Sequence, residues 1–212
     1  MSTTDGSNAA VHYTCTCNTS SRFFIGASMT KSRAFLTAAE WSEFRREYEN
    51  SDDRSCVLIC AAYIDRCLEI LISESLLHHE VLDRSLLTGM MPLGTFSARI
   101  SLAFCLNLIP SIYHEDFNTI RKIRNIFAHE LHGISFDTES VRSRCAALSV
   151  PEDYCRWLEV DFLDLSSSDP KEPRTRFLFT FAVTVQALEG HYLKRAKKTR
   201  AALQDVGAFD QS

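Results

Sequence analysis

Hydrophobic and polar residues follow each other at helical spacing over most of the chain. Between residues 53 and 77 the polar residues Asp65, Glu69 and Ser73 recur every four positions, which leaves one narrow polar stripe on an otherwise apolar helix. A helix of this kind belongs in the middle of a bundle. Amphipathic patterns predict further helices at 37–48, 96–108, 114–131 and 174–204. We therefore predict an all-α fold, a bundle of about five to seven helices.

Composition sets the expected boundaries of the domain. Residues 1–30 are rich in Ser, Thr, Asn and Gly, which is typical of a flexible tail. A chain of 212 residues fits one helical domain, and we place that domain at 31–204. Inside it, 149–173 mixes prolines, acids and serines and predicts a long connection before the C-terminal helix at 174–204. A short tail, 205–212, follows.

The chain has the composition of a cytoplasmic protein. Residues 1–22 lack the apolar stretch of a signal peptide, and no apolar run of about 18 residues is free of charge, so neither secretion nor a membrane span is expected. The formal net charge is −4, which excludes a globally basic nucleic-acid binder.

The eight cysteines do not indicate a disulfide scaffold. Cys56, Cys60 and Cys67 fall on one face of the predicted apolar helix and should be small core side chains. Cys15 and Cys17 lack a second matching pair, so we expect no zinc site there.

The segment 117–132 carries an arginine, an asparagine and a histidine within an apolar pattern. On a helical wheel Asn125 and His129 lie near the centre of one arc, and Arg124 lies at the edge of the opposite, apolar arc. The apolar arc consists of Phe117, Ile120, Ile123, Ile126, Phe127 and Leu131. An arginine in this position needs a carboxylate or a phosphate as its partner.

The sequence leaves two kinds of partner possible for Arg124, a carboxylate or a phosphate. Inside the bundle, Arg99 and Arg124 would form structural ion pairs with Asp65 or Glu69, the acids of the predicted central helix. On the surface, Arg124 and His129 would instead act on phosphate, because a guanidinium stabilises charge on a phosphoryl oxygen and an imidazole transfers a proton near neutral pH. Two copies of the chain across a dimer interface would supply a fuller set of groups.

A metal site is not expected on this helix. His129 and His132 are three residues apart, whereas H-E-x-x-H places its histidines four apart, and no third ligand stands out. We therefore expect no metal and no cofactor.

The sequence RNIFAH, with Arg124, Asn125 and His129, resembles the R-N-x-x-x-H signature of the HEPN superfamily. This resemblance implies an all-α fold. It also implies a metal-independent ribonuclease whose catalytic residues, Arg124, Asn125 and His129, meet at a dimer interface between antiparallel helices.

Longer stretches resemble the mannitol operon repressor (MtlR) family. The matching segments are 91–109 and 115–131, and with the apolar helix the resemblance covers about 50–140. Members of this family are regulators without an evident DNA-reading module, and no helix-turn-helix or zinc finger is apparent in this chain. Sequence-specific DNA binding is therefore not expected.

Five cations gather within seven positions near the C-terminus. They are Lys194, Arg195, Lys197, Lys198 and Arg200. Such a cluster is either a solvated helix end, where cations suit the helix dipole, or a candidate surface for nucleic-acid phosphate.

Two functions follow from these patterns. The first is an MtlR-like regulatory protein that acts at the level of transcription through a protein partner, either a regulator or an antitoxin-like protein. The second is a HEPN-type endoribonuclease, a toxin or defence effector, for which RNA is the substrate. Both imply a homodimer and neither implies a membrane, and the sequence leaves open whether the protein is an enzyme.

Overall fold

The computed structural model describes residues 36–76, 92–158 and 171–207, which belong to one compact unit. In these ranges the chain forms helices and connections and no strands, so the predicted all-α fold is confirmed. None of the described helices is long and apolar enough to cross a membrane. The tail predicted at 1–30, with Cys15 and Cys17, lies outside the described residues.

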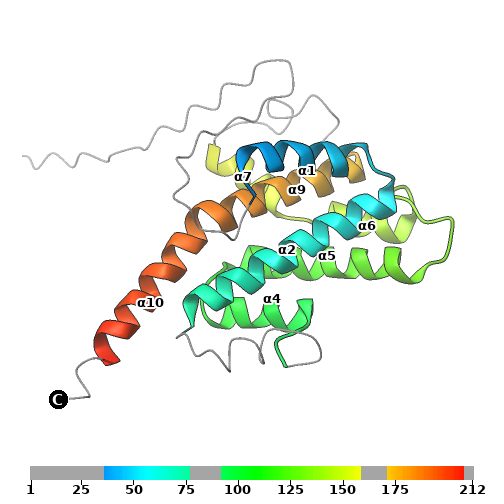
Figure 1. Cartoon of the computed structure of the whole chain (residues 1–212). Helices are drawn as coiled ribbons and strands as arrows, with labels where there is room; N and C mark the ends of the chain where they lie inside the picture. Colours follow the sequence, from blue (N-terminus) through cyan, green and yellow to red (C-terminus); the bar gives the residue numbers. More distant parts are fainter. Residues whose placement is uncertain (1–35, 77–91, 159–170, 208–212) are drawn as a thin grey trace, which may run out of the picture. The chain divides into compact units, whose positions relative to one another are not determined.

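The described helices are shown in Figure 1. They are α1 (Ala38–Asn50), α2 (Asp53–Ser75), α4 (Phe96–Cys105), α5 (Ser111–His129), α6 (Glu139–Ala146), α7 (Val150–Leu158), α9 (Pro173–Ala187), the π turn η1 (Leu188–Tyr192) and α10 (Leu193–Gly207).

Polar side chains fix where the first two helices begin. The hydroxyl of Thr37 accepts a hydrogen bond from the backbone N–H of Glu40 (3.3 Å), and the Glu40 carboxylate accepts one from the N–H of Thr37 (2.7 Å). At the start of α2, Oδ1 of Asp52 accepts from the N–H groups of Arg54 (3.0 Å) and Ser55 (3.1 Å). Both starts lie where the sequence pattern predicts them, because these caps are local.

The apolar helix α2 lies at the centre of the bundle. It packs against α1, α4, α5, α9 and α10, and Figure 1 shows it crossing α5. Cys56, Cys60 and Cys67 are at most 1% exposed and belong to the hydrophobic core, as predicted.

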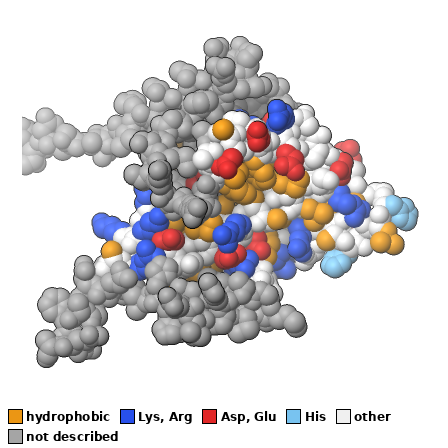
Figure 2. Space-filling model, in the orientation of Figure 1, with side chains coloured by type: hydrophobic (Ala, Val, Ile, Leu, Met, Phe, Trp, Pro, Cys, Tyr) orange, Lys and Arg blue, Asp and Glu red, His pale blue; other side chains and the backbone are white. Residues whose placement is uncertain are grey.

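A cluster of aromatic rings packs α1 against α2 and α9. The rings of Trp41 and Phe44 lie 5.6 and 4.8 Å from that of Tyr63, and the buried ring of Phe181 from α9 lies 6.2 Å from Tyr63. Trp41, Phe44 and Tyr63 are only partly buried. Figure 2 shows hydrophobic side chains gathered on this side of the molecule.

The prediction of a long connection over 149–173 is wrong in its first part, where the chain forms α7. The buried carboxylate of Asp116, on α5, accepts hydrogen bonds from the backbone N–H groups of Ser149 (2.9 and 3.0 Å) and Val150 (2.8 Å). These bonds satisfy N–H groups at the start of α7. Because Asp116 lies 33 residues before Ser149, the local sequence gives no sign of this cap. Residues 159–170 of the predicted connection lie outside the described residues.

The C-terminal helix predicted at 174–204 is present but is interrupted by a π turn. α9, η1 and α10 follow one another without a break (Figure 1). In the π turn, Glu189 accepts a hydrogen bond of 2.6 Å from the hydroxyl of Tyr63. Burial raises the pKa of the Glu189 carboxyl, and the hydrogen bond from Tyr63 acts in the opposite direction.

Candidate functional site

α5, which carries the R-N-x-x-x-H motif, has one buried side and one solvent-facing side. Its buried residues are Asp116, Phe117, Ile120, Ile123 and Phe127. We define its outward face by the residues Arg121, Lys122, Arg124, Asn125 and His129, which are exposed or partly exposed. Since no acidic residue occurs between Phe117 and His129, this outward face is uniformly cationic or neutral.

Arg124 lies on the surface. Its side chain is exposed, and Nη1 donates a hydrogen bond of 3.1 Å to Oδ1 of the neighbouring Asn125. Of the two arrangements that the sequence leaves open for Arg124, the ion pair with Asp65 or Glu69 is therefore not formed. A helical wheel gives the direction of a side chain around its own helix. It does not show which side chains of the neighbouring helices lie within reach.

Arg99, on α4, occupies both acids of α2. Its Nη1 lies 2.7 Å from Oδ1 of Asp65, and its Nη2 lies 3.4 Å from Oε2 of Glu69. Arg66 adds a contact of 2.6 Å to the other oxygen of Glu69. Arg99 is 6% exposed, so this ion-pair cluster joins α2 to α4 inside the bundle, and Arg124 is not part of it.

An arginine that the sequence analysis missed fixes the end of α5. Arg54, in the first turn of α2, donates from Nη1 to the carbonyl of Phe127 and from Nη2 to the carbonyl of Glu130, each at 2.7 Å. Carbonyls at a helix C-terminus lack partners within the helix, and Arg54 satisfies two of them. It lies 73 residues before Phe127, so no local signal could have revealed it.

The connection after α5 also departs from the prediction. The helix ends at His129, and Leu131, which the wheel assigns to the apolar arc, is 90% exposed. Gly133 follows with a φ of +73°, a conformation that favours glycine and turns the chain toward α6. Leu131 therefore lies on the surface beside His129, at the end of the outward face.

The opposite end of α5 carries a second histidine. The ring of His114 stacks on the exposed ring of Phe104, with centroids 4.6 Å apart, and Nδ2 of Asn118 donates to the His114 carbonyl (2.9 Å). The ring stack joins the start of α5 to the end of α4.

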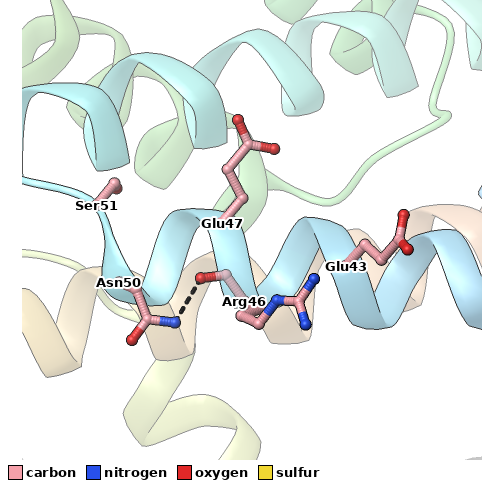
Figure 3. Close-up of a pocket in the computed structure, with 5 residues that line it drawn as sticks. All are labelled: Glu43, Arg46, Glu47, Asn50 and Ser51. Carbon is pink, nitrogen blue, oxygen red and sulfur yellow. Dashed lines mark hydrogen bonds between the residues drawn. The ribbon is translucent and has the colours of Figure 1, made fainter.

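No metal cluster occurs at this face in the described part of the chain, and the two hollows described here lie elsewhere. No group of three potential metal-ligating side chains lies together among those residues. Figure 3 shows one shallow hollow, lined by Glu43, Arg46, Glu47, Asn50 and Ser51 of α1 and the turn after it. A second hollow lies between α6, α7 and the start of α5. Neither hollow includes Arg124, Asn125 or His129.

The C-terminal cations are divided between the surface and the bundle. Lys194, Arg195 and Lys198 are exposed, while Lys197 and Arg200 are partly buried. Nη1 of Arg200 lies 3.1 Å from Oε2 of Glu74, which ties α10 to the end of α2.

Comparison with known proteins supports the fold. No protein-family model matches the sequence, and no curated protein is similar to it. The bundle is similar to MtlR in the X-ray structure of the MtlR-HPr complex from Escherichia coli, with a TM-score of 0.51 and 15% sequence identity. The similarity covers 76% of this chain and 99% of that chain. The fold of the protein is therefore MtlR-like.

Proposed function

We propose that this protein is a regulatory protein that acts by binding a protein partner through the outward face of α5. The observation that carries the proposal is the fold similarity over 99% of a chain that was crystallised as an MtlR-HPr complex. An effect at the level of transcription would then come from the partner or from the assembly, since no helix-turn-helix or zinc finger is apparent in the sequence. The protein is a homodimer in this proposal.

The geometry of the outward face fits a macromolecular partner. The face is exposed and lies outside the two hollows described above, so its side chains are open to contact with a partner's surface. Arg54 holds the end of α5 in place, which reduces the ordering cost of binding. Its cations favour a partner with an acidic surface.

HPr is the first partner to test. HPr of the same organism, titrated into the full-length protein in a calorimeter, is expected to bind with a Kd of about 1–100 μM. The double substitution Lys122→Glu and Arg124→Glu should weaken binding by at least about tenfold, because it reverses two exposed charges of the face.

A matched pair of exposed arginines serves as the control. Arg46→Glu with Arg156→Glu changes charge on α1 and α7, and should alter the Kd by less than about twofold. Equal binding by the α5 variant and the wild type would refute the assignment to α5. Absence of HPr binding at about 1 mM would refute the proposed function as stated.

A second candidate function is a HEPN-type metal-independent ribonuclease. The exposure of Arg124 favours it, because a guanidinium sealed against Asp65 or Glu69 would be unable to reach a phosphate. In this candidate Arg124 stabilises the phosphorane, His129 acts as general acid or base and Asn125 positions the scissile group, with two copies of the chain forming the site.

Incubation of the purified protein with RNA in EDTA tests this second candidate. Cleavage should occur in the wild type and be lost in both Arg124→Ala and His129→Ala. Failure to cleave any RNA, or cleavage that survives both substitutions, would rule out this chemistry.

A further inference from the structure

The buried residues of α9 form a stripe along one side of the helix. If α9 and α10 were one uninterrupted α-helix, this stripe would continue onto positions of α10 that are not the buried ones in the structure. Phe177, Phe181, Thr184 and Leu188 are buried and follow one another at intervals of three or four residues. Continued at α-helical spacing, the stripe would reach Arg195, which is seven residues after Leu188 and thus about 20° away from it on the wheel. An uninterrupted α-helix would therefore turn Arg195 into the bundle.

The π turn η1 changes this register. After it, Leu193 and Ala196 are the buried residues, at 6% and 0% exposure, whereas His191 and Arg195 are exposed. Ala196 thus takes the place that Arg195 would have in a continuous helix. A π turn accommodates one extra residue, and one residue corresponds to about 100° of rotation, so η1 turns the cations of α10 outward.

Two contacts from α2 hold the shifted register on either side of these cations. Before them, the hydroxyl of Tyr63 donates to Glu189 within the π turn at 2.6 Å. After them, Arg200 pairs with Glu74 at 3.1 Å. The outward direction of the intervening side chains is therefore fixed by packing and hydrogen bonding.

The rotation creates a continuous basic stripe on α10. We define the basic stripe by its exposed residues His191, Lys194, Arg195 and Lys198. Their spacing of i, i+3, i+4 and i+7 places them on one helix face. No acidic residue occurs between Leu193 and Leu203.

We propose that the basic stripe binds the backbone of single-stranded RNA. The outward face of α5 has the exposed Leu131 at its end, an apolar contact for a protein, whereas the side chains described as exposed between Tyr192 and Ala201 are cations and the alanine at the end. A phosphodiester backbone needs only a row of cations. The exposed imidazole of His191 adds a ring on which an unpaired base can stack, which duplex DNA does not offer.

This binding goes beyond the proposed function and is independent of it. The basic stripe lies on α10, and the outward face that would bind a protein partner lies on α5. A variant of the α5 face that loses HPr binding should therefore still bind RNA. A variant of the basic stripe that loses RNA binding should still bind HPr.

Fluorescence anisotropy with the full-length protein tests the proposal. The probe is a labelled 2′-O-methyl oligouridylate of about 20 nucleotides, whose backbone has no free 2′-hydroxyl for cleavage. Lys194→Gln with Lys198→Gln should weaken binding by about tenfold. The slope of log K against log salt should become less steep by about 1.4, or about 0.7 for each phosphate that is no longer neutralised. The control is Arg46→Gln with Arg156→Gln, which should leave both quantities unchanged.

Three outcomes would overturn the assignment of the stripe to a nucleic acid. They are absence of binding at about 50 mM salt, equal binding by the Lys194/Lys198 variant, and tighter binding of polyglutamate of matched charge. The last outcome would assign the stripe to an acidic protein. Tighter binding of a DNA duplex than of the oligouridylate would likewise contradict a single-stranded ligand.

Discussion

Arg99 and Arg124 lie on neighbouring helices in opposite surroundings. Arg99 is 6% exposed and lies between Asp65 and Glu69, whose side chains are 28% and 22% exposed. Without Arg99, two partly buried carboxylates would be deprived of their main cation and repel each other. Arg124 is exposed, and water can replace its hydrogen bond to Asn125.

The two arginines should therefore differ in their effect on stability. Arg99→Ala should lower the free energy of unfolding by about 2–3 kcal/mol, whereas Arg124→Ala should change it by less than about 0.5 kcal/mol. Urea unfolding followed by far-UV circular dichroism measures both. A larger decrease for Arg124→Ala than for Arg99→Ala would contradict the ion-pair arrangement.

Glu189 should make stability depend on pH. Burial raises the pKa of its carboxyl in the folded protein, so the folded state binds the proton more tightly than the unfolded state. Below the ordinary pKa, the protonated Glu189 makes its full favourable contribution to the stability of the folded protein. This contribution is lost as pH rises through the pKa of Glu189 in the folded state. Glu189→Gln, which keeps an acceptor for Tyr63, should therefore gain stability relative to the wild type as pH rises above the ordinary carboxyl pKa of about 4.

Melting curves of both proteins across this pH range measure the effect. The melting temperature of the Glu189→Gln variant minus that of the wild type should increase with pH. A constant or decreasing difference would show that ionised Glu189 is not disfavoured in the fold.

At the scale of elements, α7 and the end of α5 depend on side chains from distant parts of the chain. Asp116 caps α7, and Arg54 caps α5. The sequence predicts α2 and α5 well, because their apolar patterns are long and local. It does not predict α7, the end of α5 at His129 or the π turn, because contacts made across the bundle determine these features.

Removal of the Asp116 carboxylate should loosen α7. Asp116→Ala leaves the backbone N–H groups of Ser149 and Val150 without their acceptor, so the free energy of unfolding should fall by about 2–3 kcal/mol. Hydrogen exchange at amides in 150–158 should become faster than elsewhere in the bundle. Asp153 is an exposed acid of α7 itself, and Asp153→Ala is the control. It should lower the free energy of unfolding by less than about 0.5 kcal/mol. Unchanged exchange in α7 for Asp116→Ala would contradict the capping role.

At the scale of the molecule, two cationic surfaces lie on different helices. α2 is at the centre, α5 carries one cationic face, and α10 carries another that the π turn rotates outward. The candidate residues Arg124, Asn125 and His129 could be found from the sequence because they form a motif on one helix. The exposure of Arg124 could not be predicted from the sequence, since it depends on which side of α5 packs against the bundle.

The central claim is that a protein partner covers the outward face of α5, and hydroxyl-radical footprinting tests it directly. Leu131 is 90% exposed beside His129, and both side chains react readily with hydroxyl radicals when solvent can reach them. Footprinting of the protein alone and with saturating HPr should show oxidation of Leu131 and His129 falling several-fold on binding, while the exposed Trp157 of α7 stays reactive. Unchanged oxidation of Leu131 and His129 in a complex that protects another surface would contradict the claim.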